Sequence, residues 1–599
     1  MAAIEPAGRG RRRRWLGAAP VGWHAARRGL GLGLLLLSLL PGLATAAPGE
    51  CGAPGTTPVH ALAGQGAERL APEGPVTVEA VVTAAFLGDA GLDGFFVQGA
   101  APAPDGAPSG LFVYAPEPEP GWAEAIEPGR RLRLTGYAGA YRGRPQLEGL
   151  EALADCGRGE IDSRAVAWPL PEAKRARLEG VRVRIETPMA MTANGELARY
   201  GSLMLTPRRR AFRATNFRAG EGPADPALRG QRLILDDGAY RRSPRPIPHL
   251  GDGGTRRVGS RAAGLEGVLT HAFGRWRLHP VRPPRWQAAN PRPEALPPPA
   301  PGTVRVAAFN LQNYFLTLGE RGAATPAELA CQRRKLLAAL QALRADVLAL
   351  TELERRRAAA ADLVERLRRA SGAPWRLVRA PARGDAVTRV ALAYRADRVA
   401  PGEAPARRDR RPVHHRPPLA AAFEPAGGGA PFAVAVAHLK SKGGCPERGD
   451  VDRGEGCWSE RRVEQAEALD GFLAAWRARH GAPPALITGD LNAYGAEEPI
   501  RTLTGAGRAD LLAERLPWRA RYTYVFRGEA GYLHHLLAPP RLAGRAAAVR
   551  TLAINADEPR FLRYDAAGDG SRRCRGPYRS SDHDPVAVDL RIAAPGHEP

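Results

Sequence analysis

Short apolar runs alternate with longer helix-like stretches in the second half of the chain. Apolar runs bounded by polar residues predict buried strands, and the stretches between them predict helices. Helices between strands, followed by late hairpin-like strands, predict two packed mixed sheets flanked by helices. Strands are expected at 303–309, 346–351, 387–394, 431–438, 485–489, 521–526, 532–537 and 585–591. Helices are expected near 326–344, 355–370 and 459–479.

The first half of the chain has a different pattern. From Val76 to Leu153, short strand-like runs are separated by Gly, Pro and Asp, and five such runs predict a small β barrel. Alternation sends Phe95 and Phe96 to opposite faces. With Phe112 and Tyr114 they could stack bases, but we favour the interpretation that these aromatics fill the core. A second β-rich region follows.

A proline-rich segment separates the two halves. Residues 290–302 read N-P-R-P-E-A-L-P-P-P-A-P-G, and this proline density excludes helix and sheet and predicts a semi-rigid linker. A chain of 599 residues is too long for one core. The predicted parts are an export signal at 1–46, an OB-like β domain at 47–160, a second β-rich domain at 161–289, the linker, a catalytic domain at 303–593 and a tail at 594–599.

Polar groups stand where several apolar runs stop. The stretch Ala485–Tyr494 (A-L-I-T-G-D-L-N-A-Y) predicts a buried strand that ends in Asp490 and Asn492. A carboxylate that takes a proton from water, beside an amide that orients that water, suits hydrolysis of a phosphate ester. Alone this pattern is equally typical of a turn. Four further runs end in polar groups, at Asn310, at Glu352, at His438, and at Asp582 with His583. Together, five such ends predict one site at an edge of the sheets.

These ordered strand ends resemble those of the endonuclease/exonuclease/phosphatase superfamily, the fold of deoxyribonuclease I. Within it, the chain is most similar to the large secreted bacterial nucleases. The resemblance covers Thr303 to Ala593 and is weaker through the first half, where the barrel resembles the OB-like domain that precedes the catalytic domain. It implies an α/β fold, a four-layer α/β sandwich preceded by small all-β domains.

The resemblance also implies roles for individual residues. Asn310 and Glu352 match the residues that hold the essential divalent ion, and oxygen ligands of this kind suit Mg²⁺ or Mn²⁺, with Ca²⁺ as an additional candidate. Asp490 matches the general base or its equivalent, and Asn492 the residue that aligns the attacking water. A helix N-terminal charge is the structural alternative for Glu352.

The remaining matches concern the phosphate. By resemblance, His438 and His583 hold the scissile phosphate and offset charge in its transition state. Asp582 matches an orienting or metal-proximal carboxylate. Tyr394 and Arg395 resemble a phosphate-contacting pair, although both residues are commoner as structural features.

One family position is not matched. The family usually carries Leu-Asp-His after a strand similar to Tyr522–Phe526, whereas this chain has Leu533-His534-His535. The missing carboxylate would normally bond the terminal histidine and hold its tautomer. Loss of one acid–base participant typically costs about 10²–10⁴-fold in rate, so we expect reduced activity. Whether Asp557 or Glu529 compensates is left open.

The net charge of +24 permits a polyanionic partner such as DNA. Only four of the 86 basic residues are lysine. This arginine bias is also typical of a GC-rich genome, so the charge alone does not identify nucleic acid. The basic segment Arg208–Arg210 could contact phosphates, and solvated loops explain it equally well.

The first 46 residues are typical of an export signal. Arg9–Arg14 form a basic region, Leu30–Leu43 an apolar stretch and Ala44-Thr45-Ala46 a small-residue cleavage site. Both general and twin-arginine export remain open, and a retained membrane anchor is the alternative. No other segment is typical of a transmembrane helix. We therefore predict a secreted protein, periplasmic or extracellular, without a stable membrane anchor.

Six cysteines follow the export signal, and an even number in an exported chain indicates disulfides. Cys445 and Cys457 bracket a Gly- and charge-rich loop that lacks the apolar residues to hold itself in place, so we pair them. Cys51 and Cys156 bracket the barrel and could pair, which leaves Cys331 and Cys574. A zinc site is the rival interpretation, but no C-x-x-C spacing supports it.

Three functions remain in competition. The first is a secreted metal-dependent endonuclease acting on DNA, with RNA as the other candidate substrate, and we expect it to be a monomer. The second is a phosphomonoesterase or small phosphodiesterase on the same scaffold, because fold does not determine substrate. The third is a catalytically weakened nucleic-acid-binding protein, motivated by His534.

Overall fold

The computed structural model describes residues 50–592 except 64–71, 100–103, 105–106, 108, 252, 381–385 and 567–572. The predicted export signal and the tail at 594–599 lie outside the described residues. We propose part boundaries near residues 160 and 302. No helix in the described part combines the length and apolarity needed to cross a membrane.

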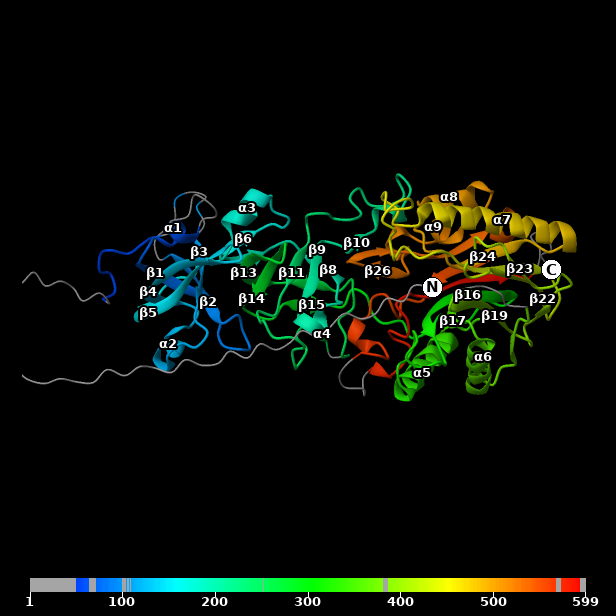
Figure 1. Ribbon diagram of the computed structural model, residues 1–599, viewed down its shortest axis with the longest axis horizontal. Coiled ribbons are helices and arrows are strands. Elements are labelled where there is room, and N and C mark those ends of the chain that lie inside the picture. The colour runs from blue at the N-terminus through cyan, green and yellow to red at the C-terminus, as the bar shows by residue number, and fades with distance from the viewer. Residues whose placement is uncertain are drawn as a thin grey trace, which may run out of the picture. The chain divides into compact units, whose positions relative to one another are not determined.

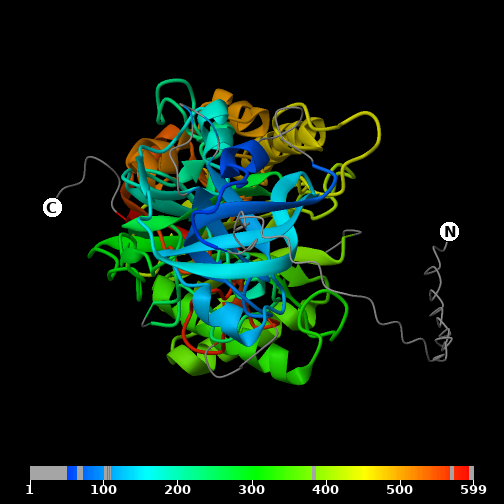
Figure 2. The same ribbon diagram turned by 90° about the vertical axis from the view of Figure 1, so that its left-hand side faces the viewer.

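The first part is a closed five-stranded barrel in the order β1-β2-β3-β5-β4, whose blue and cyan strands face the viewer in Figure 2. Strands β3 and β5 pair in parallel and close it. The elements are α1 (Val59–Ala63), β1 (Pro75–Phe86), β2 (Gly94–Gly99), β3 (Gly110–Tyr114), α2 (Pro120–Ala125), β4 (Arg130–Tyr141) and β5 (Arg144–Arg158). Phe95 lies in the barrel core, whereas Phe96 and Phe112 pack outside it against Val268. The three phenylalanine rings are buried, as the core interpretation predicted, whereas Tyr114 is 39% exposed and does not fill the core.

A nine-stranded sheet forms the middle part, in the order β15-β12-β8-β9-β11-β14-β13-β7-β6. Its elements are β6 (Arg164–Val166), α3 (Glu172–Arg177), β7 (Arg182–Ile185), β8 (Met189–Ala193), α4 (Leu197–Tyr200), β9 (Leu203–Pro207), β11 (Leu233–Leu235), β12 (Arg261–Ala263), β13 (Leu265–Ala272), β14 (Arg275–Pro280) and β15 (Arg285–Gln287). Trp168, Met189 and Leu278 belong to its buried core. The second β-rich region predicted from the sequence is therefore present.

The remaining part is the predicted four-layer α/β sandwich. One sheet has the order β18-β19-β17-β16-β30-β29, and the other runs β20-β22-β23-β24-β28-β25, with β21 paired to β22. The first sheet comprises β16 (Thr303–Tyr314), β17 (Val347–Glu354), β18 (Trp375–Leu377), β19 (Thr388–Arg395), β29 (Ala546–Thr551) and β30 (Val586–Arg591). The second comprises β20 (Val399–Pro401), β21 (Arg407–Arg408), β22 (Leu419–Pro425), β23 (Phe432–His438), β24 (Ala485–Asp490), β25 (Ala509–Asp510) and β28 (His534–Ala538).

Helices cover the outer faces of both sheets. Figure 1 shows α7 and α8 over one sheet and α5 and α6 over the other. The helices are α5 (Pro326–Leu343), α6 (Arg357–Ser371), α7 (Ser459–His480), α8 (Glu498–Gly505), α9 (Leu511–Arg515) and α10 (Pro540–Ala543). Alternate residues of β16 explain the layering, because Val306 packs between the sheets and Phe309 packs under the helices.

Two strands join the middle sheet to the sandwich. A hairpin of β26 (Tyr524–Phe526) and β27 (Glu529–Gly531) pairs in parallel with β10 (Ala211–Phe212), which makes a small three-stranded sheet. We call residues 524–531 the bridging hairpin. The proline-rich segment also packs on the sandwich, since the amide of Leu296 donates to the carbonyl of Ala342 at 2.9 Å. The segment contains no helix or strand, as predicted, but it is not a free spacer.

Three disulfides connect all six cysteines, which lie within the described residues. The pairs are Cys51–Cys156, Cys331–Cys574 and Cys445–Cys457. They are the pairs expected from the sequence. With every cysteine bonded, none is left as a thiolate for the alternative zinc site.

Candidate active site

The polar strand ends of both sheets meet at one edge of the sandwich. The parallel pair β23 and β24 places His438 opposite Asp490, and the parallel pair β16 and β17 places Asn310 beside Thr351, next to Glu352. Pairing with antiparallel β28 places His534 on the other side of Asp490. We call the following residues the strand-end cluster: Asn310, Glu352, His438, Asp490, Asn492 and His583.

Asp490 is the hub of the strand-end cluster. Its Oδ2 accepts a hydrogen bond from Nδ2 of Asn310 at 2.9 Å. The Nε2 atoms of His438 and His583 lie 3.7 and 3.8 Å from the same oxygen. Its Oδ1 accepts the amide of Asn492 at 3.0 Å. One carboxylate therefore contacts groups from both sheets and from the loop before β30.

Local backbone geometry explains the Gly-Asp-x-Asn sequence. Gly489 has φ 123°, and a Cβ there would lie 2.2 Å from the carbonyl oxygen of Ala437 on the neighbouring strand. Asn492 adopts φ 49°, and its Nδ2 donates to the carbonyl of Leu439 at 3.1 Å. Only glycine fits at position 489, and asparagine tolerates the left-handed conformation at 492.

Irregular strand pairing accompanies the two residues matched to the metal site. Pairing shifts register after Asn310 in β16 and around Glu352 in β17. Such bulges re-aim side chains beside active sites. Glu352 itself has φ 59°, a conformation that costs energy for a non-glycine residue and is concentrated at functional sites.

The carboxylates of the cluster are suited to a cation. Ligand atoms of Glu352, His438 and Asp490 lie within 4.8 Å of one another. Burial raises the pKa of Glu352, and the negative charges of Asp582 and Asp490 raise it further, against the amide of Asn310. A divalent ion would relieve this repulsion, so the donor set fits one. Asn310 points its Nδ2 at Asp490, while its Oδ1 accepts the amide of Gln312 at 2.9 Å.

The surroundings keep Asp490 ionised and keep His438 and His534 neutral. Burial, aided by the charge of Arg416, lowers the pKa of His438 well below its usual value. Burial lowers the pKa of His534 to about 3. Burial would raise the pKa of Asp490, but the neighbouring imidazoles and Asn310 outweigh it and hold that pKa well below its usual range. At neutral pH the hub is an ionised carboxylate beside neutral His438 and His534.

The ring of His583 is fixed by stacking. Tyr524 of the bridging hairpin lies nearly parallel to it, with ring centroids 4.5 Å apart and planes at 15°. The amide of His583 donates to Oγ of Ser581 at 3.2 Å, and Nε2 lies 4.0 Å from Oδ1 of Asp582. Its Nδ1 has no hydrogen-bond partner among the described residues. No role was predicted for Tyr524 from the sequence, although it lies in the stretch Tyr522–Phe526 that precedes the position of the missing carboxylate.

His534 has the surroundings of the missing carboxylate but not its bonds. Its ring lies edge-on to His583, with centroids 5.1 Å apart. It is fully buried, and neither ring nitrogen has a hydrogen-bond partner in the described part of the chain. Compensation by Asp557 or Glu529 is excluded because both carboxylates are bound by arginines of the middle part: Asp557 by Arg210 and Arg257, and Glu529 by Arg213 and Arg232.

Tyr394 and Arg395 require a correction. They pair with the start of β17, opposite Val347, whereas Glu352 is near its end. Because β19 is antiparallel to β17, its last residues lie at the far edge of the sheet. Tyr394 is buried in the core, and Arg395 pairs with Asp397 at 2.6 Å. These residues are structural, and the expected phosphate contact is wrong.

Arg416 lies at the cluster instead. Its Nε donates to the carbonyl of His438 at 3.0 Å, and its Nη2 donates to that of Leu439. Arg416 holds the end of β23 that presents His438. In the basic segment 208–210, Arg210 forms a buried ion pair with Asp557 and is therefore not free to contact a phosphate.

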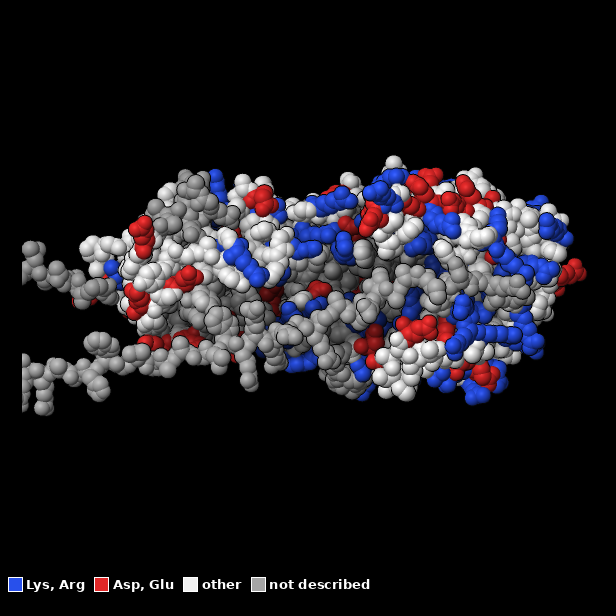
Figure 3. All heavy atoms as spheres, viewed as in Figure 1, with Lys and Arg blue, Asp and Glu red and all other residues white. Residues whose placement is uncertain are grey.

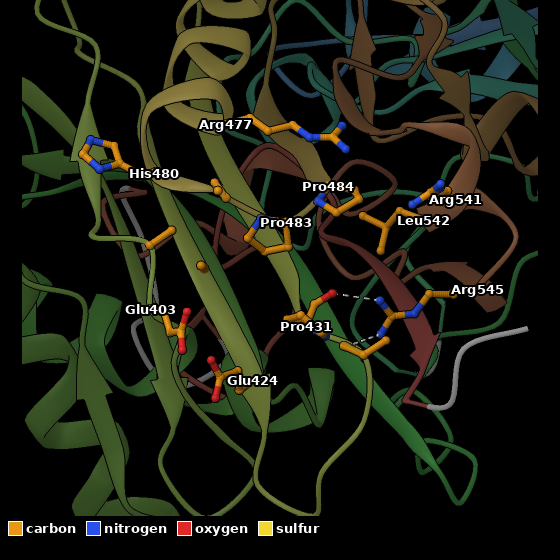
Figure 4. A pocket seen from close by; sticks show the side chains of 16 residues that line it. Glu403, Glu424, Pro431, Arg477, His480, Pro483, Pro484, Arg541, Leu542 and Arg545 are labelled. Atoms are coloured by element: carbon orange, nitrogen blue, oxygen red, sulfur yellow. Dashed lines mark hydrogen bonds between the residues drawn. The ribbon is translucent and has the colours of Figure 1, made fainter. Parts of the chain in front are cut away.

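A large cavity lies at the other end of the sheets. It has a volume of about 860 Å³ and is lined by the start of β23, the end of α7 and α10 (Figure 4). Arg545 donates to the carbonyls of Ala430 and Pro431 there. Figure 3 shows Lys and Arg interleaved with Asp and Glu over the visible face. The cavity is also lined by Glu403, Glu424 and His480, whereas the strand-end cluster surrounds one buried carboxylate with groups from several strand ends. The strand-end cluster is therefore the candidate active site.

Comparisons with known proteins find similarity in the second half of the chain. Residues 307–583 match the model of the Endonuclease/Exonuclease/phosphatase family. Similar solved structures include an endonuclease/exonuclease/phosphatase family protein from Bacteroides thetaiotaomicron, with 18% identity over 48% of this chain and 97% of that chain and a TM-score of 0.33. The human nocturnin catalytic domain has 17% identity over 49% and 95%, with a TM-score of 0.32. TDP2 from D. rerio, complexed with a single-strand DNA product, has 17% identity over 48% and 98%, with a TM-score of 0.31. A comparison with curated proteins finds no match.

Proposed function

Residues 307–583 belong to the endonuclease/exonuclease/phosphatase family, and we propose that they form a metal-dependent phosphodiesterase that hydrolyses nucleic acid, foremost as a DNA endonuclease. The convergence on Asp490 carries this proposal. Its carboxylate contacts Asn310 and lies within 3.8 Å of His438 and His583. Groups that span nearly three hundred positions in sequence thus surround one ionised oxygen.

Each residue has a role in the proposed reaction. Asp490 accepts a proton from the attacking water, and Asn492, held by Leu439, orients that water. His438 and His583 bind the scissile phosphate and offset the charge that develops on it. Asp582 lies beside His583 and orients it.

Glu352, whose carboxylate lies within 4.8 Å of ligand atoms of His438 and Asp490, would hold the divalent ion together with Asn310. The ion would be Mg²⁺ or Mn²⁺, with Ca²⁺ as an additional candidate. When bound, the ion supplies Lewis-acid stabilisation of the phosphate. The hydrogen bond from Nδ2 of Asn310 fixes Oδ2 of Asp490, the oxygen that lies near His438 and His583.

The charge of the chain permits nucleic acid as the substrate. The chain has a net charge of +24, which attracts a polyanion and speeds its association. The three disulfides favour an exported enzyme. We therefore propose that the substrate is extracellular DNA, with RNA as the other candidate, and that the protein acts as a monomer without a membrane anchor.

Supercoiled plasmid tests the proposal. The purified protein with Mg²⁺ or Mn²⁺ is expected to nick plasmid, and EDTA is expected to stop nicking. Asp490→Asn is expected to lower the rate by at least about 100-fold, because the base is lost while the hydrogen-bonding shape is kept. Asp397→Asn, at the far edge of the first sheet, is the matched control and should nick normally.

The other two functions give different outcomes in the same assay. Faster turnover of p-nitrophenyl phosphate than of plasmid would select a phosphomonoesterase. Salt-sensitive DNA binding without nicking would select the weakened binding protein. Nicking that persists in EDTA or in Asp490→Asn would refute the proposed function.

A further inference from the structure

Three aromatic rings form a column that leads from the strand-end cluster to the surface. The His583 ring stacks on Tyr524, and Tyr524 stacks on Phe526 with centroids 6.3 Å apart and planes at 12°. Tyr524 and Phe526 are two residues apart on β26, so they share one face of the strand. The column ends at Phe526, whose side chain is 49% exposed.

The hairpin that carries this column is firmly held. Its turn places Arg527 at φ 49° and Gly528 at φ 79°, values typical of a tight two-residue hairpin turn. Arg213 and Arg232 of the middle part bind Glu529. Phe526 is therefore presented by a rigid element rather than by a loose loop.

The exposed Phe526 ring is suited to bind a nucleobase. The Phe526 side chain exposes an apolar aromatic surface, and the Arg527 guanidinium lies over its ring, 5.2 Å from the centroid. Planar, electron-rich bases stack on aromatic rings, and a nearby arginine adds attraction for the nucleotide. The other end of the column is His583, which faces the scissile phosphate in the proposed reaction, so the base on Phe526 belongs to a nucleotide close to that phosphate.

We propose that Phe526 is a base-stacking subsite that binds a nucleobase flanking the scissile phosphate. The inference rests on the proposed nuclease function and adds to it a preference for unpaired or unstacked nucleotides at the cut. Stacking discriminates poorly among the four bases, since each has a π face. The subsite therefore distinguishes a nucleotide from a sugar phosphate rather than one sequence from another.

Defined oligonucleotides test the subsite. The substrate is a short single strand with one phosphodiester bond among uncharged methylphosphonate linkages, so that the cleaved bond is known. A second set replaces the base on either side of this bond by a tetrahydrofuran abasic residue. The wild-type protein is expected to lose about 5- to 100-fold in kcat/KM when the stacked base is removed.

Variants of Phe526 test whether the ring and the removed base act through the same contact. Phe526→Ala is expected to lose the same factor on the intact strand, chiefly through KM, and to show little further loss on the abasic strand. Phe526→Trp should restore the intact-strand rate because it keeps a flat aromatic face. Phe273→Ala is the matched control. Phe273 is 72% exposed, has φ 54° and has the Arg277 guanidinium 5.1 Å from its ring centroid. It lies in the turn between β13 and β14 of the middle part.

The outcomes separate the two proposals. Equal losses for Phe526→Ala on intact and abasic strands, or no loss on either, would overturn the subsite while leaving the nuclease function intact. Failure of the wild-type protein to cleave any strand, in a preparation that nicks plasmid, would overturn the subsite alone. Failure on both plasmid and single strands would overturn the nuclease function and the subsite with it. A loss restricted to the intact strand, rescued by Phe526→Trp and absent in Phe273→Ala, supports the subsite.

Discussion

Asp490 and His534 are direct neighbours across the antiparallel strands β24 and β28. Asp490 is bonded and charged, whereas His534 is buried with both ring nitrogens unpartnered among the described residues. Leaving buried polar atoms unpaired costs stability. Within the described structure, His534 thus stands unpaired beside Asp490, at the position where the resemblance implies a carboxylate.

Replacement of His534 by aspartate is expected to increase activity. A carboxylate there can accept a hydrogen bond from His583, whose Nδ1 has no partner in the described structure, and so fix the tautomer of that ring. We expect kcat for plasmid nicking to rise by about tenfold or more. His534→Asn, similar in size but uncharged, should give no such gain. Equal or lower activity of His534→Asp would show that the imidazole itself contributes to catalysis.

Replacement of Glu352 by glutamine is expected to weaken metal binding and to stabilise the metal-free fold at pH 8. Isothermal titration with Mn²⁺ should show an affinity weaker by about tenfold or more, since a charged ligand is lost. The pKa of Glu352 is raised by burial and by Asp582, so its contribution to stability is lost as pH rises through that pKa. The metal-free variant should therefore melt at a higher temperature than the metal-free wild type at pH 8.

A control and a contrary result complete this test. Glu403→Gln, at the distant cavity, should change neither the Mn²⁺ affinity nor the melting temperature. Unchanged Mn²⁺ affinity in Glu352→Gln would remove Glu352 from the proposed metal site.

Residues at strand ends could be predicted from sequence because their position depends on local pattern. The apolar run before Asp490 specifies a strand, and parallel pairing then brings His438 beside it. The placement of Tyr394 failed for a related reason: sequence pattern marks a strand but not its direction, and β19 runs antiparallel to β17. The roles of Tyr524 and Asp557 depend on contacts with residues far apart in sequence, which no local pattern contains.

The carboxylate of Asp557 is expected to be essential for joining the middle part to the sandwich. It binds Arg210 at 2.8 Å and receives hydrogen bonds from Tyr522 and Asn290, both at 2.7 Å. Asp557→Ala leaves a buried arginine unpaired, which costs about 3–5 kcal/mol in the free energy of unfolding. Urea denaturation measures this loss.

An exposed ion pair across the same contact provides the control for Asp557. Glu221 lies 3.4 Å from Arg521 and is partly exposed, so Glu221→Ala should cost no more than about 1 kcal/mol. Similar losses for both variants would show that Asp557 contributes no more than a surface pair.

The last prediction concerns Asp584, the residue after His583. Its Oδ1 accepts the amides of Asn555 and Ala556 at 2.6 and 3.1 Å, whereas Oδ2 has no partner among the described residues. Burial and the charge of Asp557 raise its pKa to about 7 from 3.8. The folded protein thus holds a proton that the unfolded chain releases, so the contribution of Asp584 to stability is fully present below pH 3.8 and is lost as pH rises through 7.

Asp584→Asn is expected to remove this dependence, because the amide keeps the acceptor oxygen and cannot ionise. The melting temperature of the variant should exceed that of the wild type at pH 8, and the difference should shrink at pH 5. Asp565→Asn, on a partly exposed carboxylate paired with Arg563, should show no such pH-dependent gain. A variant less stable than the wild type at pH 8 would mean that the Asp584 carboxylate is ionised and paired in the folded protein.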